Sequence, residues 1–162
     1  MALDSYKPLE STNFNNSWPL AKFYFRVQIE QAPEIGFQTV EGLESEISVM
    51  EYRPGNQPAF YKTKRPGMMT YSNVTLKKGM FQSHADLYMW YKLMAQDHNY
   101  RPQARKITIE LLDETNATVI TWFLADCIVT KFTPTGMDAE ADSEVALEEL
   151  EIATSYWEMQ FA

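Results

Sequence analysis

Two histidines and a single cysteine are the residues of this chain best suited to metal binding or nucleophilic catalysis. His84 and His98 have no cysteine or carboxylate partner at the spacing of a zinc site, and we expect both to lie on the surface near the ends of a helix. Cys127 lies inside an apolar run, where a small buried side chain is a commoner role than a nucleophile. The sequence therefore predicts neither a metal centre nor a catalytic thiol.

Other patterns of catalysis and ligand binding are also missing from the sequence. No nucleophile elbow surrounds a serine, and the six glycines are scattered over predicted turns instead of forming a phosphate-binding loop. The acidic run near Asp138 lacks the glycine and terminal glutamate of a calcium loop. Tyr88 and Trp90 could stack on nucleobases, but a packed helix face explains them more simply. We therefore expect no enzyme, no cofactor, and no catalytic, cofactor-binding or metal-binding residue.

Length and composition narrow the class of protein further. A chain of 162 residues is most simply one domain, residues 1–162, with a core of its own. No run approaches the roughly 20 apolar residues of a membrane span, and no export signal is visible, so we expect synthesis in the cytoplasm and no membrane insertion. The single cysteine fits a reducing compartment. The net charge of −8 argues against a protein that grips nucleic acid through its phosphates.

Charge is distributed unevenly along the chain. Basic residues gather in the central stretch and acidic residues gather near the C-terminus, a pattern that suits head-to-tail self-association. We interpret part of the acidic group as the lining of a channel or as a partner surface. Its members are Asp138, Glu140, Asp142, Glu144, Glu149 and Glu151.

The elements that must position these groups are mostly strands. Alternation over residues 22–30 predicts a half-buried strand, with Phe23, Val27 and Ile29 on its apolar face. Further strands are expected at 36–40, at 46–50 with Ile47 and Val49 facing inward, and at 73–77, 105–113, 117–132 and 147–157.

One helix interrupts this series of strands. We expect Ser83 to cap it in a capping box with Asp86, and Leu87, Trp90, Tyr91 and Met94 to form its apolar face. The predicted fold is mainly β: an antiparallel β-barrel, or a sandwich, with one flanking α-helix.

The region from residue 53 to 70 is too long for a hairpin loop, which usually has two to five residues. Its prolines, aromatic residues and cations are a poor composition for a solvated linker, so we interpret it as an extended arm that docks on a neighbouring subunit. The expected interface residues are Arg53, Asn56, Phe60, Tyr61, Lys62, Lys64, Arg65 and Tyr71. Residues 1–19 form an N-terminal segment, which either packs on a surface or frays.

Several short motifs, in order, resemble those of the tail tube proteins of contractile phages and of phage-tail-like injection systems. The most specific are Glu51-Tyr-Arg-Pro-Gly-Asn56, Lys64-Arg-Pro-Gly67 and Tyr71-Ser-Asn-Val-Thr-Leu-Lys-Lys-Gly79. The likeness runs from about Pro19 to Trp157. It is closer to the phage and extracellular injection-system branch than to the haemolysin-coregulated proteins of type VI secretion.

This resemblance implies a bacterial structural protein with no enzymatic activity. Six copies would close into a ring, and rings would stack into a hollow inner tube inside a contractile sheath, with the arm bridging subunits. Baseplate, spike and terminator or cap proteins would adjoin its ends, and effectors or DNA would pass through the lumen. The particle would remain in the cytoplasm or be released.

Three alternatives stay open at this point. The tube could belong to a contractile phage and conduct DNA, although we favour an injection system. A monomeric, lipocalin-like barrel that binds a small molecule would leave the long arm unexplained. A flavin-binding split barrel would lack a phosphate-binding feature.

Overall fold

A computed structural model describes residues 20–98, 103–140 and 143–162. The predicted N-terminal segment, residues 1–19, lies outside the described residues. Nine strands and one helix are present in the described ranges. In chain order they are β1 Phe25–Ile29, β2 Thr39–Glu41, β3 Ser45–Tyr52, β4 Thr63–Tyr71, β5 Val74–Gly79, α1 Asp86–Gln96, β6 Arg105–Leu112, β7 Thr118–Thr133, β8 Leu147–Ala153 and β9 Tyr156–Phe161. In strands such as β5 and β8 fully buried residues alternate with partly exposed ones, as is typical of a sheet with one face on the core.

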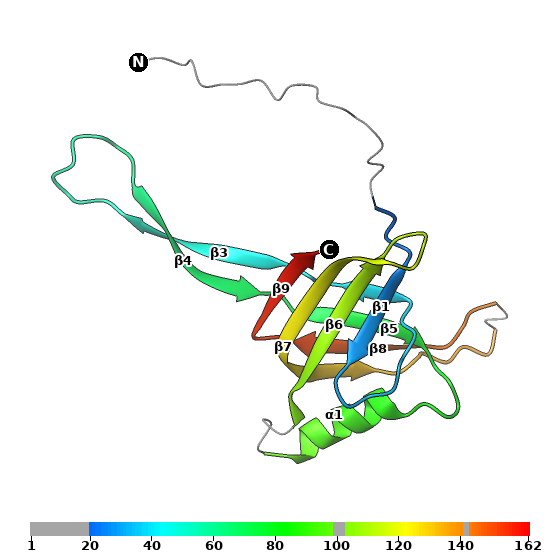
Figure 1. Ribbon diagram of the computed structural model, residues 1–162. Coiled ribbons are helices and arrows are strands. Elements are labelled where there is room, and N and C mark those ends of the chain that lie inside the picture. Colours follow the sequence, from blue (N-terminus) through cyan, green and yellow to red (C-terminus); the bar gives the residue numbers. More distant parts are fainter. Residues whose placement is uncertain (1–19, 99–102, 141–142) are drawn as a thin grey trace.

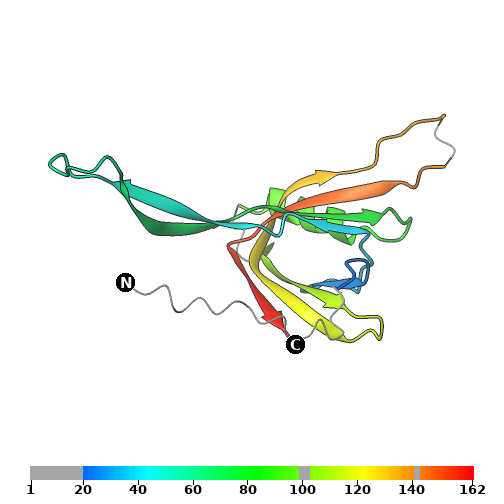
Figure 2. The same ribbon diagram turned by 90° about the horizontal axis from the view of Figure 1, so that it is seen from above.

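Seven of the strands form one antiparallel sheet that folds over on itself. Its hydrogen-bonded order is β1-β6-β7-β8-β5-β2, and β9 adds to the free side of β7. The long strand β7 makes this possible, because its first half pairs with β6 and β9 while its second half pairs with β8. Between the halves Asp126 has a positive φ of 50°, and Figure 2 shows β7 turning there from one layer into the other. The predicted antiparallel, mainly β fold with one helix is confirmed, with the ladder ending at β1 and β2.

The core lies between the two layers and under the helix. Alternate residues of β5 and β8, such as Leu76, Leu150 and Ile152, are fully buried because their strands turn one face inward. Helix α1 crosses one end of the sheet and buries Leu87 and Trp90 from the face predicted for it (Figure 1). These contacts form the hydrophobic core of the body.

Two predicted element starts are wrong, and the strand expected at 147–157 is divided into β8 and β9. Ser83 does not cap α1, because the helix begins at Asp86 after Ala85 and has no side-chain cap hydrogen bond. Strand β1 begins at Phe25, so Phe23 lies before it and is exposed. Periodicity located both elements but did not fix their first residues.

One ion pair is buried in the body. The Lys78 ammonium on β5 contacts the Glu148 carboxylate on the neighbouring strand β8, and both side chains are almost completely buried. The Lys78 ammonium also lies 5.9 Å from the centre of the Phe81 ring. The register Lys78↔Glu148 places the two charges opposite each other across the ladder, so the pair is linked to this one alignment of β5 and β8.

Strands β3 and β4 form a separate two-stranded sheet. Figures 1 and 2 both show this hairpin projecting from the body as a long twisted ribbon, and we call residues 45–71 the arm. It contains the predicted arm, residues 53–70, together with the preceding strand. Gly42, with a φ of +89°, begins the exit from the body, and a Cβ there would lie 2.2 Å from the Asn73 carbonyl oxygen. Only glycine therefore fits where the arm leaves the sheet.

Candidate subunit interface

The register of the arm gives it two faces. In an antiparallel pair, residues directly opposite each other point to the same side, so Met50 and Tyr52 share a face with Arg65 and Thr63. We call these four residues the Arg65 face. Glu51 and Lys64 lie opposite each other on the other side, which we call the Glu51 face.

Both faces carry exposed apolar side chains. Ile47 and Val49, which the sequence predicted to face inward, are 50% and 57% exposed because β3 runs away from the body. Tyr52, on the Arg65 face, is 71% exposed. A two-stranded ribbon is marginally stable in water by itself, and uncovered apolar residues on both sides make it a surface that requires a partner.

A bulge twists the middle of the arm. The register shifts by one residue between Ile47 and Val49, so Gly67 and Met68 together lie opposite Ser48. The Ser48 hydroxyl donates a hydrogen bond to the Met68 carbonyl at 3.0 Å. A Cβ on Gly67 would lie 2.5 Å from the Ser48 Oγ atom, so a larger residue there would displace the Ser48 hydroxyl from its hydrogen bond at the bulge.

Arg53 organises the tip of the arm from within. Its guanidinium donates hydrogen bonds to the Gln57 carbonyl at 2.9 Å and the Ala59 carbonyl at 3.2 Å. It also lies 5.6 Å from the centre of the Phe60 ring, whose residue is 96% exposed. The sequence predicted Arg53 as an interface residue, and within the chain its side chain holds the tip loop in place.

Lys62 and Lys64 are paired within the arm as well. Their ammonium groups lie 3.0 Å and 3.3 Å from the two carboxylate oxygens of Glu51. The hydrogen bond from Lys62 and then that from Lys64 lower the pKa of the Glu51 carboxyl below its ordinary value. These pairs cross the hairpin and favour its register, while the Lys62 and Lys64 side chains stay 62% and 68% exposed.

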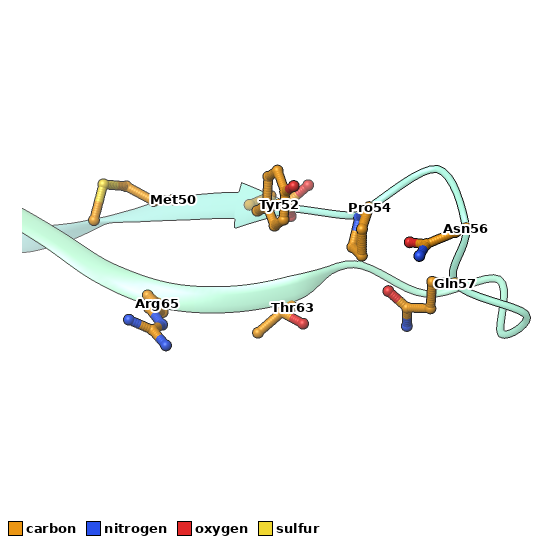
Figure 3. A pocket seen from close by; sticks show the side chains of 8 residues that line it. Met50, Tyr52, Pro54, Asn56, Gln57, Thr63 and Arg65 are labelled. Carbon is orange, nitrogen blue, oxygen red and sulfur yellow. The ribbon is translucent and has the colours of Figure 1, made fainter.

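Arg65 differs from the other cations of the arm. Among the described residues its side chain has no hydrogen bond or ion pair, and it is exposed. It lines a hollow of about 850 Å³ together with Met50, Glu51, Tyr52 and residues of the tip loop. Figure 3 shows Asn56 and Gln57 pointing back from the tip loop toward the strands, above and beside this hollow.

Tyr71 lies at the base of the arm. Its ring meets the Trp157 ring of β9 edge to face, with centroids 5.9 Å apart. The Trp157 indole N–H is buried and has no hydrogen-bond partner in the described part of the chain. Tyr71 therefore joins the arm to the body, whereas exposed Tyr61 lies near the tip.

The structure divides the predicted acidic group into two. Glu149 and Glu151 lie on β8, where the Lys77 ammonium is 3.6 Å from the Glu149 carboxylate and the Asn73 amide donates to Glu151 at 2.7 Å. Asp138, Glu140 and Glu144 lie in the exposed connection between β7 and β8. Asp142 lies outside the described residues.

The exposed residues of β3 are the part of this surface that sequence reasoning missed. Apolar side chains occur at both even and odd positions of β3, as Ile47, Val49, Met50 and Tyr52. A strand with one solvent-exposed face would carry apolar residues at alternate positions only. Apolar residues on both faces were the available signal that this strand is not a body strand with one face on the core.

Among the described residues, the side chains suited to metal binding or nucleophilic catalysis do not come together. Within residues 20–98, 103–140 and 143–162, no cluster of three or more histidine, cysteine, aspartate or glutamate residues could hold a metal ion. Burial raises the pKa of the Cys127 thiol to about 11, which keeps it protonated and unreactive near neutral pH. His84 and His98 are exposed, as predicted. None of the helices formed by the described residues has the length and apolarity to span a membrane.

Comparison with solved structures shows the same fold in particles with tubes and sheaths. A chain of the PVC sheath–tube complex, an extracellular contractile injection system in its extended state, is 25% identical with a TM-score of 0.78, over 90% of this chain and 93% of that chain. A chain of the PVC sheath/tube terminator is 26% identical with a TM-score of 0.77, over 89% and 98%. A chain of the anti-feeding prophage cap shares the fold at 22% identity, with a TM-score of 0.82 over 96% and 99%.

Comparison of the sequence identifies the family. No curated protein sequence matches the chain. The family described as T4-like virus tail tube protein gp19 matches residues 21–158, which include the arm and every described strand of the seven-stranded sheet except the end of β9. The chain therefore belongs to the T4-like virus tail tube protein gp19 family and is a structural component of a contractile tail tube.

Proposed function

We propose that six copies of this chain form a ring and that the rings stack into the hollow inner tube of a contractile injection system. The arm is the observation that carries this proposal. It projects from the body with apolar side chains uncovered on both faces, and neighbouring copies in a tube would cover them. Because each added copy would contact several others at once, weak contacts would act together.

The ends of the main sheet favour the same assembly. Its hydrogen-bonded order ends at β1 and β2, so each copy presents strand edges with unpaired backbone groups. A closed ring of identical copies covers such edges with the next subunit, whereas a free monomer leaves them open to aggregation.

The polar side of β2, β5 and β8 is our candidate for the wall of the channel. Glu41, Lys77 and Glu149 lie across it, with the Lys77 ammonium 3.9 Å from Glu41 and 3.6 Å from Glu149. The predicted acidic lumen is thus partly neutralised by a cation of the same chain. Such a wall would let cargo pass without strong binding.

Names of the similar structures suggest the partners. They include a sheath–tube complex, a tube terminator, a cap and a baseplate, so we propose contacts of this tube with sheath, cap or terminator, and baseplate proteins. The particle would be made in the bacterial cytoplasm and carry effectors through the lumen. Its subunit would be structural, without catalysis or a cofactor.

The family model favours one alternative, because it describes the tail tubes of T4-like viruses. In that case the tube would conduct DNA. The 25–26% identity to chains of an extracellular injection system leads us to prefer effector cargo. Genes for a capsid beside the gene for this chain would favour the phage instead.

Assembly of the purified chain tests the proposal. We expect light scattering after size exclusion to give a hexamer or larger species, and negative-stain electron microscopy to show rings or tubes. A stable monomer at all concentrations would contradict the proposal and would favour a small-molecule-binding barrel.

A further inference from the structure

The arm carries four cations, and three of them have a partner within the arm. Arg53 is bound to the tip loop, and Lys62 and Lys64 are bound to Glu51. Arg65 projects from the opposite side without a side-chain partner in the described residues. Arg65 is therefore the cation of the arm whose charge is not already paired within the described part of the chain.

The Arg65 face also has the shape and composition of a docking surface. Met50 and Tyr52 stand beside Arg65 and line the hollow with it, and no other described element of the chain covers them. Aromatic residues and arginine, set among apolar side chains, are typical of the central part of protein interfaces.

A complementary surface lies in the connection between β7 and β8. Described residues on either side of positions 141–142 line a hollow of about 630 Å³, which we call the acidic hollow. Met137 and Val145 are 96% and 75% exposed there, beside Asp138 and Glu144. This surface combines apolar side chains with the opposite charge.

Glu144 is the freer of the two carboxylates in the acidic hollow. One Asp138 oxygen accepts a hydrogen bond from the Glu140 backbone N–H at 3.0 Å, whereas Glu144 has no hydrogen bond or ion pair among the described residues. Glu144 is therefore the carboxylate available to an incoming cation.

The two surfaces cannot meet within one chain. Figures 1 and 2 show the arm and the β7–β8 connection projecting from opposite sides of the body. A second copy, displaced along the direction of the arm, would bring its acidic hollow to the first copy's Arg65 face. Each copy would then use its arm on one neighbour and its acidic hollow on another, so the contact would repeat head to tail along a row of copies.

We propose that the Arg65 face of one copy docks on the acidic hollow of a second copy, with the Arg65 guanidinium paired to the Glu144 carboxylate. Met50 and Tyr52 pack there against Met137 and Val145, and the surrounding apolar contacts exclude water from the ion pair. This inference rests on the proposed tube and assigns one of its contacts between subunits.

A charge swap tests this contact. Arg65→Glu and Glu144→Arg should each lower the fraction of protein pelleted as tubes by about tenfold or more, because each places like charges together. The double variant should restore most of the pelleted fraction. Lys92→Gln on α1 is the control for Arg65→Gln: the former removes an exposed cation from the body and should assemble well, whereas the latter should assemble poorly.

Cross-linking supplies a second measurement that does not require loss of assembly. In a Cys127→Ser chain, Met50→Cys and Met137→Cys together should form disulfide-linked oligomers in tubes, and either substitution alone should not. Wild-type protein that never assembles would overturn the proposed tube itself. Tubes that tolerate Arg65→Glu, or a double variant that stays defective together with absent cross-links, would overturn this contact and leave the tube standing.

Discussion

In the body, Leu76, Leu150 and Ile152 are fully buried, whereas in the arm Ile47 and Val49 leave half or more of their surface exposed. The residue types are similar, and so is the antiparallel pairing. The difference is that body strands are covered by a second layer and a helix, while no described segment of the chain covers either face of the arm. The apolar side chains of a strand are therefore fully buried only where the same chain covers the face on which they lie.

The ion pairs of the two regions differ in the same way. Lys78 and Glu148 are buried, so the loss of either partner leaves an uncompensated charge away from water. Glu51 with Lys62 and Lys64 is exposed, where water can replace a lost partner. The first pair fixes the alignment of body strands, and the second orients a hairpin that remains accessible.

The largest expected effect comes from removing the arm. Ser45 and Tyr71 are opposite each other in the register, so an Asn-Gly turn can replace residues 46–70. We expect assembly into rings and tubes to be lost while the circular dichroism spectrum and cooperative melting of the body persist. An unfolded product would show that the arm belongs to the body's stability, and the comparison would fail.

A second prediction contrasts the two ion pairs. Lys78→Met should lower the free energy of unfolding of the unassembled chain by about 3–5 kcal/mol, because it leaves the buried Glu148 carboxylate without its partner. Lys62→Met should leave the denaturation midpoint unchanged. Urea unfolding followed by tryptophan fluorescence measures both, and equal effects would refute the distinction.

A third prediction contrasts the two sets of apolar side chains. Leu150→Ala should cost about 2–5 kcal/mol of stability, since it opens a cavity in the core. Val49→Ala on the arm should cost less than about 0.5 kcal/mol in the unassembled chain, yet reduce tube formation. A large loss of stability in the unassembled Val49→Ala chain would contradict this prediction.

The smallest effect concerns thiol reactivity. At pH 8 the Cys127 thiol, with a pKa of about 11, should be about one-thousandth thiolate and should react with a maleimide only after unfolding. A cysteine introduced by Met68→Cys on the arm should react at the rate of a free thiol. Rapid labelling of native Cys127 would show that the body opens readily.

The sequence predicted those elements whose patterns are local. The alternation of Val27 and Ile29 and the helical spacing of Leu87 and Trp90 identified a strand and a helix that bury these residues. Ser83 was a wrong cap because the helix start depends on backbone geometry. Local periodicity gives the face of a helix or strand on which a residue lies, whereas tertiary contacts decide where the element begins and how deeply the residue is buried.

The candidate interface was less accessible to sequence reasoning. Its region was identified from the length and composition of residues 53–70, but the roles of individual cations depended on the hairpin register. That register brings Lys64 to Glu51 and turns Arg65 to the other face, and the tip loop engages Arg53. Alternation alone also could not show that Ile47 and Val49 lie on a projecting ribbon.

Amide hydrogen exchange of β3 and β4, measured in tubes and in an unassembled variant such as Arg65→Glu, tests the central claim most directly. If neighbouring copies cover the arm, its amides should exchange rapidly in the unassembled chain and become strongly protected in tubes, while β5 and β8 stay protected in both. Equal exchange of the arm in the two states would contradict the account.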